Sequence, residues 1–207
     1  MSATQPIIHV LDDDSSFRTA VMRLLRAAKH EVRGYRSASE FIDSDPCAAP
    51  GCILLDLRMP GVNGLELQQS LAQMDARLPI IFLTGHGDIP ASVRAMKAGA
   101  MDFLTKPVER ATLLRAVANA LEFDAAERKS WTILRELRRR YETLTPRERE
   151  VLAHVVSGKL NKQIAFDLGT SERTIKAHRA HIMDKLTIES IAELVRIAES
   201  LGIQPIR

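Results

Sequence analysis

The sequence predicts an α/β domain followed by an all-α domain. In roughly the first 120 residues, short apolar segments alternate with longer segments whose apolar residues recur at helical spacing. That alternation indicates parallel strands wrapped by helices. In roughly the last 60 residues only the helical spacing recurs, and it begins repeatedly at helix-capping motifs. A chain of 207 residues accommodates two small domains, so we expect a five-stranded parallel sheet in the first and four helices in the second.

Five short apolar segments are the expected strands. A short apolar run enclosed by turn residues is typical of a strand that is buried on both faces of a parallel sheet. The clearest example is Cys52–Leu55, which leads into Asp56 and then into the turn at Pro60–Gly61. The expected strands are Ile7–Leu11, a short strand around Val32, Cys52–Leu55, Pro79–Leu83 and Met101–Thr105.

Amphipathic segments between these strands predict helices. Apolar residues three and four positions apart form one buried stripe on a helix. Ser37 and Glu40 have the spacing of a capping box and mark the start of the second helix, and Gly99 marks the end of the fourth. The stripes comprise Phe17, Val21, Leu24, Leu25 and Ala28 in the first helix, Leu65, Leu67, Leu71 and Met74 in the third, and Val93 and Met96 in the fourth.

Polar side chains follow the carboxyl ends of four expected strands: Asp12 and Asp13, then Asp56, Thr84 and Lys106. In open parallel sheets the functional site lies beyond these ends. Clustered carboxylates raise one another's pKa values, and a divalent cation removes that cost. Hard oxygen ligands with an open face suit Mg²⁺ (or Mn²⁺), while the threonine and the lysine suit a phosphoryl group. The residues therefore predict a site for a metal ion and a phosphoryl group, with Asp14 beside it as a helix cap or a solvated acid.

Charge is divided unevenly along the chain. Residues 1–124 hold 13 Lys or Arg against 15 Asp or Glu, a net charge of −2, and residues 125–207 hold 16 against 11, a net charge of +5. A basic C-terminal part suggests that this part meets a polyanion. Cys47 and Cys52 are too few for a disulfide framework or a four-ligand zinc site, so we expect both to be reduced.

The N-terminal residues lack the charged and apolar regions of a signal peptide. No apolar run approaches the roughly 20 residues that a membrane span requires. We therefore expect a soluble, cytoplasmic protein without a membrane partner.

Residues 125–143 are expected to form a helical linker between domains in residues 1–124 and 144–207. No Gly or Pro lies between Val108 and Thr145, which predicts one long or once-broken helix whose residues turn charged after its first apolar stripe. A coiled-coil-like seam with spacings of three, four and three follows, formed by Leu134, Leu137, Tyr141 and Leu144. Two interpretations remain open: this helix pairs in a dimer, or it packs on its own domains.

Four helices are expected after the linker. Thr145–Glu148 combines a capping box with proline at the first helical position. Two short helices around a tight glycine turn are similar to a helix-turn-helix, whose second helix enters the major groove of DNA. The expected helices run from Thr145 to Gly158, from an Asn161 cap to Gly169, from a Ser171 cap to Leu186, and from a Ser190/Glu193 capping box to Gly202.

One side of the third of these helices is suited to DNA. Ile175, Ile182 and Leu186 face the core, while small residues and flanking cations lie on the opposite side and allow a close approach to the bases. Arg179 and Lys185 lie nearer the core side and suit the phosphate backbone. The candidate DNA-binding residues are Arg173, Thr174, Lys176, Ala177, Arg179, Ala180, His181 and Lys185.

The motifs of the first part, taken together, resemble a bacterial two-component receiver domain over roughly residues 5–124. The motifs that carry this resemblance are Leu11-Asp12-Asp13, the stretch Leu55–Gly61, Thr84-Gly85, Ala98-Gly99-Ala100, Phe103 and Lys106-Pro107. The resemblance implies a flavodoxin-like (βα)5 fold in which a sensor histidine kinase phosphorylates Asp56.

The resemblance also implies a role for each motif residue. Asp12, Asp13, Asp56 and the main-chain carbonyl of Arg58 would hold Mg²⁺. Thr84 and Phe103 would be the switch pair, Lys106 would bind the phosphoryl group, and a cis peptide bond would join Lys106 to Pro107. Self-phosphotransfer to Asp56 and slow autodephosphorylation there would be the only chemistry, so the protein would not be an enzyme acting on a separate substrate.

Residues 144–201 are similar to the LuxR-type DNA-binding domain, through the segments Leu144–Leu152, Gly158–Ala165 and Thr174–Arg179. The combination resembles response regulators of the FixJ/NarL class, and Thr84–Asp88 favours the FixJ side. It implies a transcriptional regulator that binds double-stranded promoter DNA, contacts RNA polymerase and forms a homodimer on phosphorylation.

Two alternatives carry less weight. Asp12, Asp14 and Ser16 have the spacing that opens haloacid-dehalogenase-type phosphatases, but those enzymes place a second acidic motif after their lysine. Here Asp56 precedes Thr84 and no strand-terminal acid follows Lys106, so the order of motifs favours the receiver. A DNA-binding protein that works independently of phosphorylation is the other alternative, and the complete set of acid, threonine and lysine opposes it.

Overall fold

A computed structural model describes residues 5–46, 49–74, 78–85 and 89–203. The chain divides into two compact units, which are residues 1–128 (the N-terminal unit) and residues 129–207 (the C-terminal unit). Within the described ranges, no helix combines the length and the apolar character that crossing a membrane would require.

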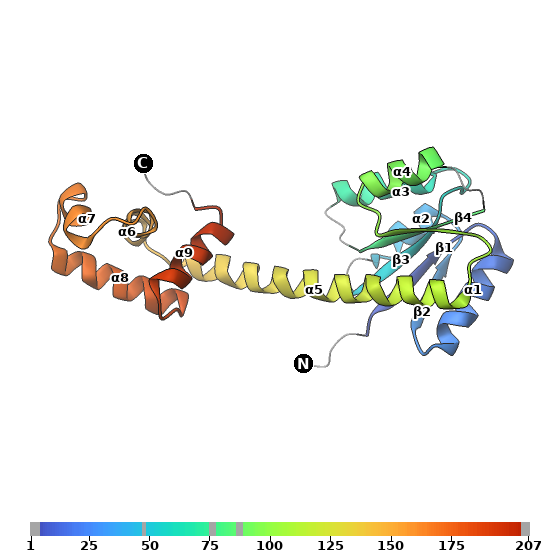
Figure 1. Ribbon diagram of the computed structural model, residues 1–207, viewed down its shortest axis with the longest axis horizontal. Coiled ribbons are helices and arrows are strands. Elements are labelled where there is room, and N and C mark those ends of the chain that lie inside the picture. The colour runs from blue at the N-terminus through green and yellow to red at the C-terminus, as the bar shows by residue number, and fades with distance from the viewer. Residues whose placement is uncertain (1–4, 47–48, 75–77, 86–88, 204–207) are drawn as a thin grey trace. The chain divides into compact units, whose positions relative to one another are not determined.

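The N-terminal unit is built on a five-stranded parallel sheet (Figure 1). The strand order is β2-β1-β3-β4-β5, so β1 and β3 are neighbours at the centre and all carboxyl ends meet at one edge. Every residue of the three central strands is buried, as their apolar sequences predict. The strands are β1 (Ile7–Leu11), β2 (Glu31–Tyr35), β3 (Gly51–Asp56), β4 (Ile80–Thr84) and β5 (Asp102–Thr105).

Helices cover both faces of this sheet. One face packs against α1 (Ser15–Ala27) and the first turns of α5 (Arg110–Glu142), where Leu25 and Leu113 are buried. The other face packs against α2 (Ala38–Asp43), α3 (Gly64–Gln73) and α4 (Ile89–Lys97), and Figure 1 shows α3 and α4 on the side opposite to α5. Cys52 is a buried free thiol within the first of these cores, while Cys47 lies outside the described residues.

Side chains fix where the helices begin. Asp14 caps α1 by accepting hydrogen bonds from the main-chain N–H groups of Ser16 and Phe17, as expected. The capping box expected for Ser37 and Glu40 forms only in half. Ser37 accepts from the Glu40 N–H, but the Glu40 carboxylate turns back to the main-chain N–H of Arg36 instead of Ser37.

Helix α5 is one continuous helix from Arg110 to Glu142, which is the unbroken form of the two that the sequence left open. The charged stretch that follows its first apolar stripe does not all face solvent, because Asp124 is buried. Its carboxylate accepts a hydrogen bond from the Gly51 N–H (2.9 Å) and pairs with Arg128, whose guanidinium also donates to the Ala49 carbonyl (2.8 Å). Asp124 therefore fastens α5 to the segment that leads into β3.

The C-terminal unit is a helical domain with its own core. Its core takes in Leu144 and packs against Tyr141, so the end of the expected seam packs on its own domain; the pairing of Leu134 and Leu137 in a dimer stays a prediction. Beyond α5, the unit comprises α6 (Pro146–Val156), α7 (Asn161–Asp167), α8 (Glu172–Leu186) and α9 (Ile191–Ser200).

The caps at the helix starts of this unit agree only in part with those predicted from the sequence. The Thr145/Glu148 capping box forms completely, with proline directly after the cap. Asn161 was expected to cap α7, but it is the first helical residue, and the Gln163 side chain caps the turn by accepting from the Leu160 N–H. Ser190 accepts from the Glu193 N–H, yet the Glu193 carboxylate takes the N–H of Glu189, so this box also forms only in half.

A buried carboxylate joins two helices of this unit. Glu148 on α6 accepts from the Lys185 ammonium on α8 (2.7 Å) and from the Thr145 N–H (2.8 Å). Burial alone would raise the pKa of Glu148, but the hydrogen bonds from Lys185 and Thr145 outweigh burial and hold the pKa below its ordinary value. The charged carboxylate is therefore part of the folded state.

Replacing Asp124 should destabilise the N-terminal unit. Asp124→Ala leaves the Gly51 N–H without its acceptor and removes the carboxylate that pairs with Arg128, at a cost of roughly 1–3 kcal/mol. Urea unfolding followed by circular dichroism, with exchange of the β3 amides to assign the transition, measures the loss. Glu122→Ala, which removes an exposed carboxylate from the same helix, is the control; equal effects of the two variants would contradict the anchoring role.

Glu148→Gln should destabilise the C-terminal unit in a pH-dependent manner. The folded-state pKa of Glu148 lies below its ordinary value of 4.5, so the carboxylate contributes stability above about pH 4.5 and loses it as pH falls through the folded-state pKa. The difference in unfolding free energy between wild type and variant should thus reach its maximum near pH 6 and decrease below pH 4.5. Glu150→Gln, an exposed partner of Arg147 on the same helix, should show a smaller difference. A pH-independent loss in Glu148→Gln would refute this assignment.

Candidate acidic site and nucleic-acid interface

Three carboxylates meet at the carboxyl edge of the sheet. Asp12 and Asp13 follow β1 and Asp56 ends β3, and because these strands are neighbours, ligand oxygens of all three side chains lie within 4.8 Å of one another. Asp12 is fully buried, Asp56 is 8% exposed and Asp13 is exposed. The arrangement leaves the cluster open to solvent on the Asp13 side.

The Lys106 ammonium lies between two of these carboxylates. Its Nζ donates to Asp12 Oδ2 (2.7 Å) and to Asp56 Oδ2 (2.9 Å), and it also lies over the Phe17 ring, 4.3 Å from the ring centroid. Burial raises the pKa of Asp12 and outweighs the opposing effect of Lys106. Burial also opposes charge on Lys106, but its hydrogen bonds to Asp12 and Asp56 raise the pKa of the ammonium above its ordinary value.

The remaining contacts hold the carboxylates in place. Asp12 Oδ1 accepts from the Asp14 N–H (3.0 Å), and Asp56 Oδ1 accepts from the Arg58 N–H (3.3 Å). The second bond brings the Arg58 main chain beside Asp56. The Arg18 guanidinium donates to the main-chain carbonyl of Asp12. This contact was not predicted, although an arginine one turn into the helix after the acids was the available signal.

The donor set fits a hard divalent cation. Carboxylate oxygens from Asp12, Asp13 and Asp56, open on one side, are the ligands that Mg²⁺ takes in proteins while retaining water. A cation there would also relieve the repulsion among three acids that Lys106 offsets only in part.

The other predicted site residues lie on the two neighbouring strands. Thr84 ends β4 and is buried, and its carbonyl accepts from the Lys106 N–H (2.6 Å), which ties the ends of β4 and β5 together. Phe103 on β5 is half-buried, and its ring centroid lies 6.1 Å from that of Phe82. The peptide bond between Lys106 and Pro107 is cis, as the resemblance implied. His86–Asp88, in the loop after Thr84, lie outside the described residues.

Most of the predicted DNA-binding residues are exposed on α8. This helix follows α7 across a turn at Gly169, which has a positive φ of 63° that glycine adopts without strain. Ile175, Ile182 and Leu186 are buried against the core as predicted. The exposed residues are Arg173, Thr174, Lys176, Ala177, Ala180 and His181.

Two of the candidate DNA-contacting cations are engaged inside the domain. Arg179 donates to Asn161 Oδ1 (2.7 Å), which ties α8 to α7. Lys185 donates to the buried Glu148 (2.7 Å). The first bond holds the helix-turn-helix together and the second ties α8 to α6. A contact of Arg179 or Lys185 with the phosphate backbone therefore stays a prediction that the folded geometry does not favour.

Two known families match this chain in the same order as the two units. The family described as "Response regulator receiver domain" matches residues 8–118, and the family described as "Bacterial regulatory proteins, luxR family" matches residues 142–198. The first match covers the sheet and the acidic site, and the second covers the helix-turn-helix.

Relatives extend the match over nearly the whole chain. Nodulation protein W of Bradyrhizobium diazoefficiens is 44% identical over 202 residues, which cover 98% of this chain and 89% of the relative. The transcriptional regulatory protein FixJ of Rhizobium meliloti is 39% identical over 202 residues, covering 98% and 99%. The solved structure of the response regulator StyR is similar with a TM-score of 0.83 and 44% identity, over 94% of this chain and 98% of that one. The chain therefore belongs to the response regulators that join a receiver domain to a LuxR-type DNA-binding domain, and it is a transcriptional regulator of a two-component system.

Proposed function

We propose that phosphorylation of Asp56 by a sensor histidine kinase switches this regulator. The observation that carries the proposal is the position of Asp56: its carboxylate lies at the edge of the sheet, within the acidic cluster and 2.9 Å from the Lys106 ammonium. An Asp56 oxygen would form the new P–O bond as the P–N bond of a kinase phosphohistidine breaks, and the histidine nitrogen would keep the electron pair.

The residues around Asp56 have distinct roles in this proposal. Asp12, Asp13, Asp56 and the Arg58 carbonyl would hold Mg²⁺ (or Mn²⁺), which supplies positive charge to the transferring phosphoryl group. Lys106 already lies beside Asp56, so its ammonium can pair with the phosphoryl oxygens without a large movement. Loss of the phosphoryl group to water would reset the site, and no separate substrate would be turned over.

The response would pass from Asp56 through Thr84 and Phe103. The Thr84 hydroxyl would donate to a phosphoryl oxygen, and the Phe103 ring would turn inward against Phe82. These movements would reshape the face formed by residues 88–122. The α4 residues Ile89, Val93 and Met96 expose apolar side chains, at 74%, 47% and 46%, which supports a homodimer of phosphorylated chains on this face.

The output would be transcription activation at a promoter. The exposed side of α8 would enter the major groove, with Ala177 and Ala180 against the bases and Arg173, Lys176 and His181 beside base edges or phosphates. Two such units in a dimer would match two half-sites. RNA polymerase would be the partner that the bound dimer recruits.

Asp56→Asn should abolish the phosphate-dependent step and leave the fold intact. The amide keeps the shape of the side chain but cannot form the acyl phosphate. Incubation with acetyl phosphate and Mg²⁺ followed by mass spectrometry of the intact protein measures phosphorylation, and sedimentation with and without beryllofluoride measures dimer formation. Asp43→Asn, at an exposed site on α2, should behave as wild type. A full response of Asp56→Asn would show that another residue is the acceptor.

Lys176→Gln should reduce the salt dependence of DNA binding. Each lysine that contacts a phosphate contributes about 0.9 to the slope of log K against log salt concentration, so the slope should fall by about that amount if Lys176 contacts the backbone. Fluorescence anisotropy with a duplex of random sequence gives the slope. Arg196→Gln removes an exposed cation on α9 instead. If both variants changed the slope equally, α8 would not be the helix that approaches DNA.

A further inference from the structure

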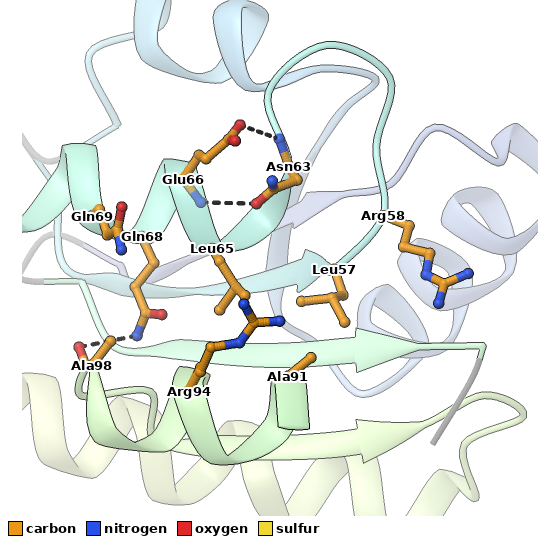
Figure 2. Close-up of a pocket in the computed structure, with 10 residues that line it drawn as sticks. All are labelled: Leu57, Arg58, Asn63, Leu65, Glu66, Gln68, Gln69, Ala91, Arg94 and Ala98. Atoms are coloured by element: carbon orange, nitrogen blue, oxygen red, sulfur yellow. Dashed lines mark hydrogen bonds between the residues drawn. The ribbon is translucent and has the colours of Figure 1, made fainter. Parts of the chain in front are cut away.

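A cleft lies between α3 and α4 of the receiver unit, and its lining includes none of the three clustered acids. Its volume is about 380 Å³, within the range of small-molecule sites. Figure 2 shows the cleft from the side, with the apolar side chains of Leu57, Leu65 and Ala91 facing the space between the two helices. Leu57 and Ala91 are buried, and Leu65 is half-buried. An apolar floor of this kind suits a small hydrocarbon or ring.

A buried hydrogen-bond acceptor without a partner lies at one end of this cleft. Gln68 is 4% exposed, and its Nε2 donates to the carbonyls of Ala95 (3.2 Å) and Ala98 (3.1 Å) at the end of α4. Both amide hydrogens are thereby used, while Gln68 Oε1 has no hydrogen-bond partner. In Figure 2 this oxygen is on the side of the amide that faces Leu65 and Arg94. A buried unpaired acceptor is costly, so a ligand that offers an O–H or N–H there would gain a bond that the protein alone does not make.

A cation borders the same space. The guanidinium of Arg94 on α4 lies beside Leu65 in Figure 2, and it forms no ion pair or hydrogen bond with another residue in the described part of the chain. Glu66 also lines the cleft, and its carboxylate accepts from the Asn63 N–H (3.1 Å) as part of the α3 cap. Arg94 is therefore free to pair with an anion, and a planar carboxylate matches its paired N–H donors.

We propose that the α3–α4 cleft binds a small amphipathic carboxylate that carries a hydroxyl donor. The carboxylate pairs with Arg94, the apolar body lies on Leu57, Leu65 and Ala91, and the hydroxyl donates to Gln68 Oε1. None of the three proposed contacts involves Asp12, Asp13 or Lys106, but the cleft borders the phosphorylation site through Leu57 and Arg58, which follow Asp56 directly.

The first test is binding of 4-hydroxybenzoate to the full chain. Isothermal titration calorimetry gives the affinity, and amide chemical shifts locate the ligand, with the largest changes expected on α3 and α4. Two matched ligands separate the contributions: 4-hydroxybenzamide lacks the negative charge, and benzoate lacks the hydroxyl donor. Each should bind more weakly than the hydroxy acid. Equal affinity for the neutral amide would overturn the assignment to an anion.

The second test changes the protein. Arg94→Gln should weaken the binding of 4-hydroxybenzoate about tenfold or more, because the ion pair between the guanidinium and the ligand carboxylate is lost. Lys97→Gln removes an exposed cation from the same helix but outside the lining of the cleft, and it should leave the affinity unchanged. Both positions are on the surface, so circular dichroism should show a native fold for each. No measurable binding by wild type, or equal binding by wild type and Arg94→Gln, would overturn the proposal.

Discussion

The receiver unit depends on one electrostatic constraint: acids placed at the end of buried strands need a cation. Asp12 is fully buried, and its neighbour Asp56 is nearly so. Lys106 bridges them with bonds of 2.7 and 2.9 Å, although it lies 94 and 50 residues away in sequence. The parallel sheet makes this bridge possible, because β1 and β3 are adjacent and β5 ends on the same edge. The strand order therefore determines both the geometry of the acidic cluster and the position of the Lys106 side chain.

Buried acids also anchor helices in both units. Asp124 ties α5 to the chain before β3, and Glu148 ties α6 to α8. In each case the carboxylate accepts from a main-chain N–H as well as from a cationic side chain. Such pairs lose much of their benefit to desolvation, but removing one partner leaves an uncompensated charge. They therefore act chiefly to specify which surfaces meet.

The contacts of residues at strand ends could be predicted well from the sequence, and the contacts of residues on helices could be predicted less well. Asp12, Asp13 and Asp56 come at the ends of apolar runs, and Lys106 directly follows β5. The rule for parallel sheets was therefore enough to bring them together. Asp124, by contrast, sits in a charged stretch of α5 and resembles its exposed neighbours in sequence. Lys185 has the spacing of a DNA-contacting residue, yet it is bound to Glu148. Helical periodicity predicts which face of the helix a residue lies on. It does not predict which residue of another helix or strand that side chain contacts.

The sequence by itself determined the order and type of the secondary structure, the two-domain organisation, and which acids gather at the carboxyl edge of the sheet. Apolar periodicity and capping residues are local properties of the sequence, so these features can be predicted without knowledge of the tertiary structure. Only the tertiary structure decided that Glu40 and Glu193 cap through the preceding residue, that Asp124 is buried, and that Gln68 leaves an unpaired oxygen beside Arg94. Each of these depends on the distance between side chains of different elements, or on a choice between main-chain donors one residue apart. Packing sets those distances, and no spacing within a single segment encodes them.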